Sequence, residues 1–212
     1  DEGFVGWGAE DMELGYRLHH AGVRLVMSRR AWAIETPHRR DVAANLASNI
    51  QNLRLFQSKH DCPETELFCA CRRRRVPVQQ AYAEFEAWTS AVRSLDVRAE
   101  LAELAGDPSH LVGGRVAVLG GGVALPDGWP ACTVLDFDSA ALAKAVAGTP
   151  HTGRHAIGVR TLLPDGSFDL VLVSSRLSGL WDTWGEDVLA EARRLGRQVR
   201  AFPDLPEPQR AW

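Results

Sequence analysis

The 212-residue sequence predicts an α/β fold, on the strength of two observations. From about residue 110 onward, short apolar runs alternate with helical patterns, which is typical of parallel strands joined by helices. Before that point helical periods dominate, and a loop rich in glycine and aromatic residues opens the chain. We therefore expect three parts: residues 1–60, a helical extension and linker over residues 61–109, and a small parallel-sheet domain over residues 110–212.

Residues 1–60 are expected to form a loop, a helix, two short strands and a second helix. Glu10 and Asp11 suit the negative charge favoured at a helix N-terminus, and Gly22 suits the position just after the helix end. The apolar residues at helical spacing between them are Met12, Leu14, Leu18 and Ala21. The strands are predicted over residues 23–27 and 31–34.

The second helix of this part should run from Asp41 to about His60. Its spacing places five apolar residues on one side, which we expect to be buried: Val42, Leu46, Ile50, Leu53 and Phe56.

Residues 61–109 predict one long helix after a basic run. Four consecutive arginines, residues 72–75, could touch an anion, but we interpret them as a solvated face. A helix is expected from about residue 79 to residue 105, with Tyr82, Phe85, Trp88, Val92 and Leu95 on its apolar side. The Gly-Asp-Pro at residues 106–108 should end the helix and form a linker.

Residues 110–212 show strands alternating with helices. Strands are predicted over residues 115–119, 132–135, 168–173 and 198–202, and helices over residues 139–147 and 186–195. Such an order indicates a parallel sheet covered by helices.

Composition limits the class of protein. With 45% hydrophobic and 24% charged residues the chain is of the globular type. A net charge of −3 argues against general nucleic-acid binding, which favours a positive surplus. No run approaches 18 apolar residues, so no membrane span is expected, and the opening residues lack the pattern of a signal peptide. The four cysteines lack metal-site spacing and are typical of reduced thiols, so we expect a cytoplasmic protein.

The first eleven residues hold four carboxylates, two aromatic rings and three glycines. Transfer of a sugar from a nucleotide donor requires a base for the acceptor hydroxyl and a positive group for the departing diphosphate. Trp7 offers an aromatic face for a sugar, Glu10 and Asp11 offer carboxylates, and the glycines allow close backbone approach. The structural alternative is that Glu10 and Asp11 only favour the helix N-terminus and that Trp7 is a core residue.

The stretch from Gly3 to Asp11, with the Glu-Leu and Arg-Leu pairs that follow it, resembles the acceptor-side, C-terminal part of GT-A-fold glycosyltransferases. The closest pattern is that of the β-1,4-galactosyltransferase and polypeptide N-acetylgalactosaminyltransferase groups and their bacterial family-2 relatives. The resemblance implies that Asp11 is the catalytic base. It implies that Trp7, Glu10 and Gly8 contact the acceptor sugar, and that Asp1 and Glu2 line the acceptor pocket.

The same resemblance implies a metal ligand. His38, in His-Arg-Arg-Asp, stands where the galactosyltransferases have the histidine of a His-Ser-Arg-Asp stretch, and would help to bind Mn²⁺ or Mg²⁺. Two residues depart from the pattern: Ala9 replaces a glycine, and Glu35 replaces a methionine.

The implied reaction transfers a hexose or an N-acetylhexosamine from a UDP-sugar to a hydroxyl acceptor, which is a sugar, a peptide or a small molecule. Because the nucleotide-binding half with its Asp-x-Asp motif is not in this sequence, we expect a fragment with weak or no transferase activity by itself.

Residues 114–202 resemble class I S-adenosylmethionine-dependent methyltransferases, whose fold is Rossmann-like. Gly120 and Gly122 match the glycine-rich loop after the first strand, and Asp136 matches the acid that holds the ribose hydroxyls, so these three residues would bind S-adenosylmethionine. Val118 stands where that family has an acid. The structural alternative is that the glycines turn the chain and Asp136 caps a helix.

Three functions therefore stay open. The leading one is a glycosyltransferase fragment. The others are a noncatalytic module that binds an acceptor or a partner, and a methyltransferase that uses residues 114–202.

Overall fold

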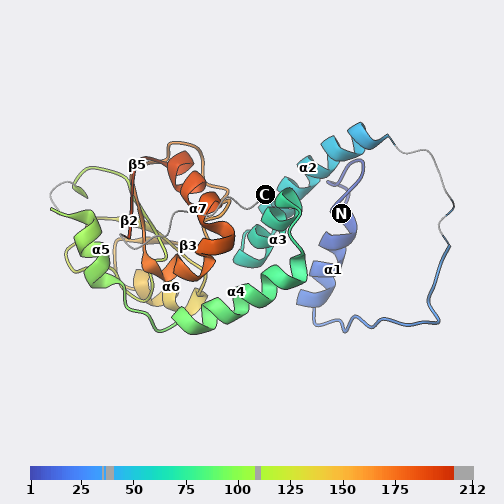
Figure 1. Ribbon diagram of the computed structural model, residues 1–212, viewed down its shortest axis with the longest axis horizontal. Coiled ribbons are helices and arrows are strands. Elements are labelled where there is room, and N and C mark those ends of the chain that lie inside the picture. The colour runs from blue at the N-terminus through green and yellow to red at the C-terminus, as the bar shows by residue number, and fades with distance from the viewer. Residues whose placement is uncertain (35, 37–40, 108–110, 203–212) are drawn as a thin grey trace. The chain divides into compact units, whose positions relative to one another are not determined.

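The computed structural model describes residues 1–34, 36, 41–107 and 111–202, and Figure 1 shows its elements. Contacts divide the chain into two compact units, residues 1–60 and residues 61–212. The helices between residues 61 and 105 belong to the second unit.

The first unit contains α1 (Glu10–His20) and α2 (Val42–Lys59). Gly22, with φ +75°, ends α1 as predicted: its N–H donates to the carbonyl of His19, and the N–H of Val23 donates to the carbonyl of Leu18. The predicted apolar side of this helix is largely solvent-exposed, since Met12 and Leu14 are 46% and 49% exposed.

The second helix is confirmed, and Asp41 caps it by accepting a hydrogen bond from the N–H of Ala44 at 3.0 Å. Its predicted apolar side is buried only near the C-terminal end, where Phe56 is 3% exposed. Val42, Leu46 and Ile50 are all exposed, so the prediction of a continuous buried side was wrong.

The two strands predicted in the first unit do not form. Residues 23–27 and 31–34 have no strand structure, and Val26, Met27 and Trp32 are 68%, 100% and 75% exposed. A strand needs a neighbouring strand for its backbone hydrogen bonds, and the described residues of 1–60 offer none. The apolar composition that predicted strands is therefore left facing solvent.

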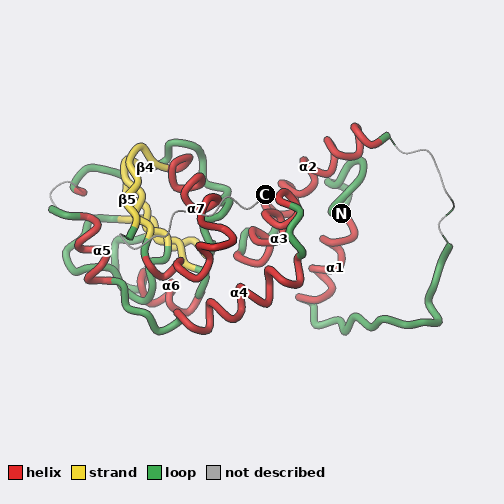
Figure 2. Tube along the Cα trace, in the orientation of Figure 1, coloured by secondary structure: helices red, strands yellow, loops and turns green. Residues whose placement is uncertain are grey.

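The second unit is built on a five-stranded parallel sheet with the order β3-β2-β1-β4-β5. Its strands, yellow in Figure 2, are β1 (Val116–Leu119), β2 (Cys132–Asp136), β3 (Thr152–His155), β4 (Phe168–Val173) and β5 (Gly196–Ala201). This order confirms the predicted α/β class and the Rossmann-like sheet. From β1 the chain adds β2 and β3 on one side of the sheet and then returns to add β4 and β5 on the other side. The junction between β1 and β4 is therefore the topological switch point of the sheet.

Side chains of β1 alternate between two apolar clusters, one on each face of the sheet. Ala117 and Leu119 belong to the cluster that includes residues of α3 (Pro63–Arg74), α4 (Val78–Val92) and α7 (Trp181–Leu195). Val116 and Val118 belong to the cluster that includes residues of α5 (Arg98–Ala105) and α6 (Ser139–Val146). The sheet is therefore covered on both faces, as its uninterrupted apolar strands require.

Two predictions for this unit were incomplete. The long helix expected over residues 79–105 is broken between Val92 and Arg98, giving α4 and α5. β3 was missed because its sequence, Thr-Gly-Arg-His, is polar and largely exposed at the sheet edge, so it carries no apolar pattern.

The four arginines lie at the C-terminal end of α3, and two of them form ion pairs. Arg73 and Arg74 pair with Asp187 of α7 at 2.7 and 2.8 Å, and the Arg74 guanidinium lies 5.1 Å from the Trp184 ring centre. Half of the run thus holds α3 on α7, while Arg72 and Arg75 face solvent. Among the described helices, none is long and apolar enough to cross a membrane.

Candidate functional site

The opening loop of the first unit is held against α2 by polar contacts. The hydroxyl oxygen of Ser48 lies 3.1 Å from both the backbone nitrogen and the backbone oxygen of Trp7. Asn52 donates from its side-chain amide to the carbonyl of Val5 at 3.3 Å. Side chains of one helix therefore satisfy the backbone of a loop that has no secondary structure of its own.

Two glycines of the loop are required by its shape. Gly6 has φ +81°, and a Cβ there would lie 2.8 Å from the Cβ of Ser48. Gly8 has φ +107°, and a Cβ there would lie 2.2 Å from the Oδ1 of Asn49. The backbone conformation and the contact with α2 both exclude a side chain, so packing accounts for Gly8 whether or not it also touches a sugar.

The three side chains expected to meet an acceptor are accessible. Trp7 is 47% exposed, so it is not the core residue of the structural alternative. Glu10 and Asp11 are exposed in the first turn of α1, which begins after Ala9 in a left-handed conformation with φ 68°. One short stretch thus presents an indole ring and two carboxylates to solvent.

The other two acids of the predicted pocket differ from each other. Asp1 pairs with Lys59 at 2.8 Å, and its other oxygen accepts the N–H of Gly3 at 2.8 Å. Glu2 is exposed. Asp1 therefore fastens the loop to the end of α2.

Glu13, the acid of the Glu-Leu pair after Asp11, is a buried carboxylate to which the sequence assigned no role. It is 1% exposed and lies 2.8 Å from Arg17 Nε and 3.1 Å from His60 Nε2. Burial pushes the pKa of Glu13 upward, but hydrogen bonds from His60 and Arg17 outweigh it, and the pKa falls below its ordinary value. The Glu-x-x-x-Arg spacing was the available signal.

The predicted metal ligand cannot be placed, because His38 lies outside the described residues. Within the described part of the chain, no group of three or more histidine, cysteine, aspartate or glutamate side chains is arranged to hold a metal ion. Metal binding through His38 stays a prediction.

In the second unit, Asp136 ends β2 with a fully buried side chain. One oxygen accepts the N–H of Gly122 and the Nε of Arg176, both at 2.8 Å. The other accepts the N–H of Asp138 at 2.9 Å and faces Arg176 Nη2 at 3.3 Å. All four acceptor positions of the carboxylate are therefore in use.

The glycine loop after β1 is also tightly packed against neighbouring side chains. A Cβ at Gly120 would lie 2.7 Å from the hydroxyl of Ser174, and one at Gly121 would lie 2.3 Å from a methyl group of Val134. Gly120 and Gly122 have φ +79° and +66°. The loop thus packs against the protein itself, and Asp136 is saturated, so these residues do not fit the ribose contact expected for S-adenosylmethionine.

The alternative role considered for Asp136 was to cap a helix, but the cap of α6 is the neighbouring acid, Asp138. Asp138, two residues after Asp136, accepts hydrogen bonds from the N–H groups of Ala140 and Ala141 at 2.9 and 3.1 Å and so caps α6.

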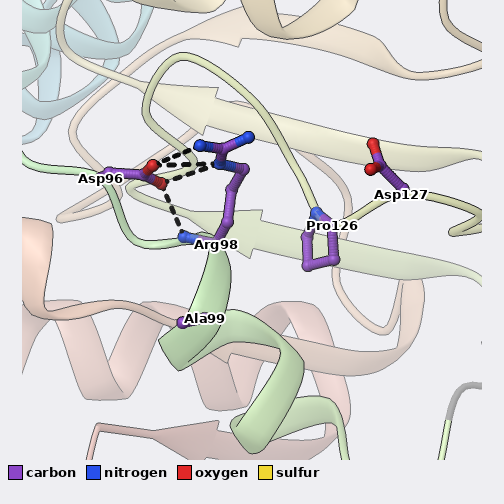
Figure 3. A pocket seen from close by; sticks show the side chains of 5 residues that line it. All are labelled: Asp96, Arg98, Ala99, Pro126 and Asp127. Atoms are coloured by element: carbon purple, nitrogen blue, oxygen red, sulfur yellow. Dashed lines mark hydrogen bonds and ion pairs between the residues drawn. The ribbon is translucent and has the colours of Figure 1, made fainter.

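An open cavity of about 500 Å³ lies between the start of α5 and the loop that follows β1. Figure 3 shows its lining: Asp96, Arg98, Ala99, Pro126 and Asp127. Arg98 is engaged by Asp96 at 2.6 Å, and both are exposed. Residues of the glycine loop and Asp136 do not contribute to its lining.

Comparison with known proteins gives two relatives of the same kind. The chain is 38% identical, over 94% of its length, to validoxylamine A glucosyltransferase of Streptomyces hygroscopicus subsp. limoneus, of which it covers 46%. It is 37% identical, over 94% of its length, to the protein of the same name from subsp. jinggangensis strain 5008, of which it covers 49%. The chain thus spans about half the length of the curated relatives it matches.

No protein-family model matches the chain. Among solved structures, a SAM-dependent methyltransferase of Thermotoga maritima, described as a possible histamine N-methyltransferase, aligns with a TM-score of 0.37 and 23% identity. The alignment covers 57% of this chain and 56% of that one. Both curated relatives, in contrast, are named as glucosyltransferases.

Proposed function

We propose that this chain is the acceptor-side part of a glycosyltransferase that moves a hexosyl group from a UDP-sugar to a hydroxyl acceptor. The two relatives, both named as glucosyltransferases, favour glucose as the sugar. The observation that carries the proposal is the exposure of Trp7, Glu10 and Asp11 together on one stretch in a chain so similar to those relatives.

Asp11 is the base in this proposal. Its side chain is exposed, and among the described residues no cation pairs with it, so it can accept a proton. The proton of the acceptor hydroxyl passes to an oxygen of Asp11 as the hydroxyl oxygen bonds to the anomeric carbon of the donor sugar. The bond from that carbon to the diphosphate breaks at the same time, and UDP leaves with the electron pair.

Trp7 and Glu10 orient the acceptor. The exposed indole offers a face on which the C–H groups of a sugar ring can pack, and Glu10 offers oxygens that accept hydrogen bonds from hydroxyl groups. A divalent cation, held in part by His38, would neutralise the departing diphosphate. The contacts with Ser48 and Asn52 hold the backbone of the loop, which keeps these side chains in place before the acceptor arrives.

For the second unit we propose a noncatalytic role. The saturated carboxylate of Asp136 favours a module that binds an acceptor or a partner over a methyltransferase.

The proposal is tested with the protein extended to the length of its relatives. Radiolabelled UDP-glucose is supplied with a panel of hydroxyl acceptors, and transfer is followed by chromatography. Trp7→Ala and Glu10→Gln should raise KM for the acceptor about tenfold or more while KM for UDP-glucose stays unchanged. If both variants retain the wild-type acceptor KM, the proposed acceptor contacts are wrong.

A further inference from the structure

The switch point of the second unit's sheet is closed by the chain itself. In open α/β sheets, ligands bind in the crevice outside the carboxyl ends of the strands at this junction, which here lies between β1 and β4. The hydroxyl of Ser174, directly after β4, donates to the carbonyl of Gly120, directly after β1, at 2.6 Å. The turn η2 (Ser175–Leu180) follows at once and carries Arg176.

The guanidinium of Arg176 is fully buried and bound on every side. It makes the two contacts with Asp136 described above, at 2.8 and 3.3 Å. Its Nη1 donates to the carbonyls of Val92 and Arg93, at 2.5 and 3.1 Å. Its Cζ lies 4.7 Å from the ring centre of Phe137, the residue after Asp136.

These contacts join two distant parts of the unit. Val92 and Arg93 lie at the C-terminal end of α4, where carbonyls lack partners within the helix and where a positive charge is favoured. Asp136 ends β2, and Gly122 belongs to the loop after β1. One side chain therefore links the end of α4 to the ligand-binding edge of the sheet.

We propose that Arg176 is an internal ligand: its guanidinium occupies the place where this type of sheet takes a nucleoside cofactor, and the unit binds none. A ribose could reach Asp136 only by displacing a buried guanidinium and leaving one charge without its partner, which is strongly unfavourable. The pair instead fixes the C-terminal end of α4 on the sheet. The backbone oxygen of Leu95 and the side chain of Val97 then lie 3.6 Å from where a Cβ on Gly122 would be, so the segment after α4 covers the glycine loop.

The first test is a binding measurement on the wild-type chain. Isothermal titration with S-adenosylmethionine, and separately with NAD⁺, at about 100-fold excess over protein should give no saturable heat. Saturable binding of either ligand would overturn the proposal, because the unit would then have room for a nucleoside cofactor.

The second test measures the link itself. Arg176→Met should lower the melting temperature by roughly 10 °C and speed amide exchange in residues 89–92, the last turn of α4, and at Leu95 at least tenfold, since the end of α4 loses its anchor. Arg98→Met is the matched control: it removes an exposed arginine–aspartate pair, and should shift the melting temperature by less than about 2 °C.

The double variant Asp136→Leu with Arg176→Met leaves no unpaired charge and keeps the test decisive if the single variant folds poorly. It should recover at least half of the lost melting temperature, while amide exchange in residues 89–92 and at Leu95 stays fast. Wild-type exchange in these amides, in Arg176→Met or in the double variant, would show that the guanidinium does not anchor α4 and would refute the positioning role.

Discussion

Glu66 allows a quantitative prediction about the stability of the second unit. This α3 residue is 2% exposed, and its carboxylate accepts the N–H groups of Ile157, Gly158 and Arg160 at 2.7, 3.0 and 2.7 Å. It thereby holds the loop that follows β3. Burial raises the pKa of Glu66 to about 7, a rise that the nearby Glu191 reinforces and that the backbone N–H groups only partly oppose.

The size of the effect follows from the pKa. The pKa of the Glu66 carboxyl rises from 4.5 to about 7 on folding, and this difference corresponds to a free energy of about 3 kcal/mol. Because the folded state holds the proton more tightly than the unfolded state, this stabilisation is fully present below pH 4.5. It is lost as the pH rises through about 7.

Glu66→Gln cannot titrate, and it isolates this contribution. Urea unfolding at pH 5, 6, 7 and 8 should show the wild-type free energy of unfolding falling by roughly 2–3 kcal/mol more than that of the variant, since most of the effect lies in this range. Amide exchange at Ile157, Gly158 and Arg160 reports the same change locally. Equal pH dependence in the two proteins would refute the reasoning, because it would mean that the carboxylate pays no net cost for burial.

Three further predictions concern packing, capping and thiol chemistry. Gly8→Ala should destabilise the first unit by about 2 kcal/mol or more, measured by amide exchange in α2. Gly15→Ala is the control: Gly15 lies in the middle of α1 with open space around it, and the change should stabilise the unit by about 0.5–1 kcal/mol. Equal effects of the two changes would contradict the contact between Gly8 and Asn49. Asp41→Ala should cost about 1 kcal/mol and fray the start of α2, and unchanged exchange at residues 42–46 would show that the cap does not matter. Burial raises the pKa of the Cys71 and Cys132 thiols to about 11, so iodoacetamide at pH 8 should leave both unmodified in the native chain, by mass spectrometry, and label them after denaturation; labelling at the denatured rate would contradict their burial.

Most of the second unit follows from local sequence. Apolar runs such as residues 116–119 and 168–173 predicted four of the five strands, because strands buried on both faces need continuous apolar sequence. β3 could not be found this way, because it pairs with β2 at the edge of the sheet and exposes a polar sequence that carries no apolar pattern. The break between α4 and α5 was also hidden, since residues 93–97 end the helix where Arg176 binds its last carbonyls, a contact 83 and 84 residues away in sequence.

In the first unit, local sequence predicted the structure less well. Its apolar pattern predicted strands and a continuous buried helix face, yet Met27, Trp32 and Leu46 face solvent in the unit as described. Local pattern records which residues favour burial, but burial needs a partner surface, and a pattern does not contain that surface. The motif residues Trp7, Glu10 and Asp11 were nevertheless found, because adjacent residues on one loop need no long-range contact to be brought together.

Asp136 illustrates how a correct position can carry a different role. The acid at the end of β2 stands where a ribose ligand would need it, and sequence alone cannot show what occupies it. The buried arginine that binds it comes 40 residues later, in a short turn with no recognisable pattern.

The proposed role of Asp11 as the base of a sugar transfer is tested most directly by one pair of variants. In the protein extended to the length of its relatives, Asp11→Asn should lower kcat for transfer from UDP-glucose by a factor of roughly 10² to 10⁴ and leave KM for the donor within about threefold. Asp61→Asn, which removes an exposed carboxylate 3.7 Å from Arg154, serves as the control and should retain wild-type kcat. A kcat for Asp11→Asn equal to that of the control would show that Asp11 is not the base.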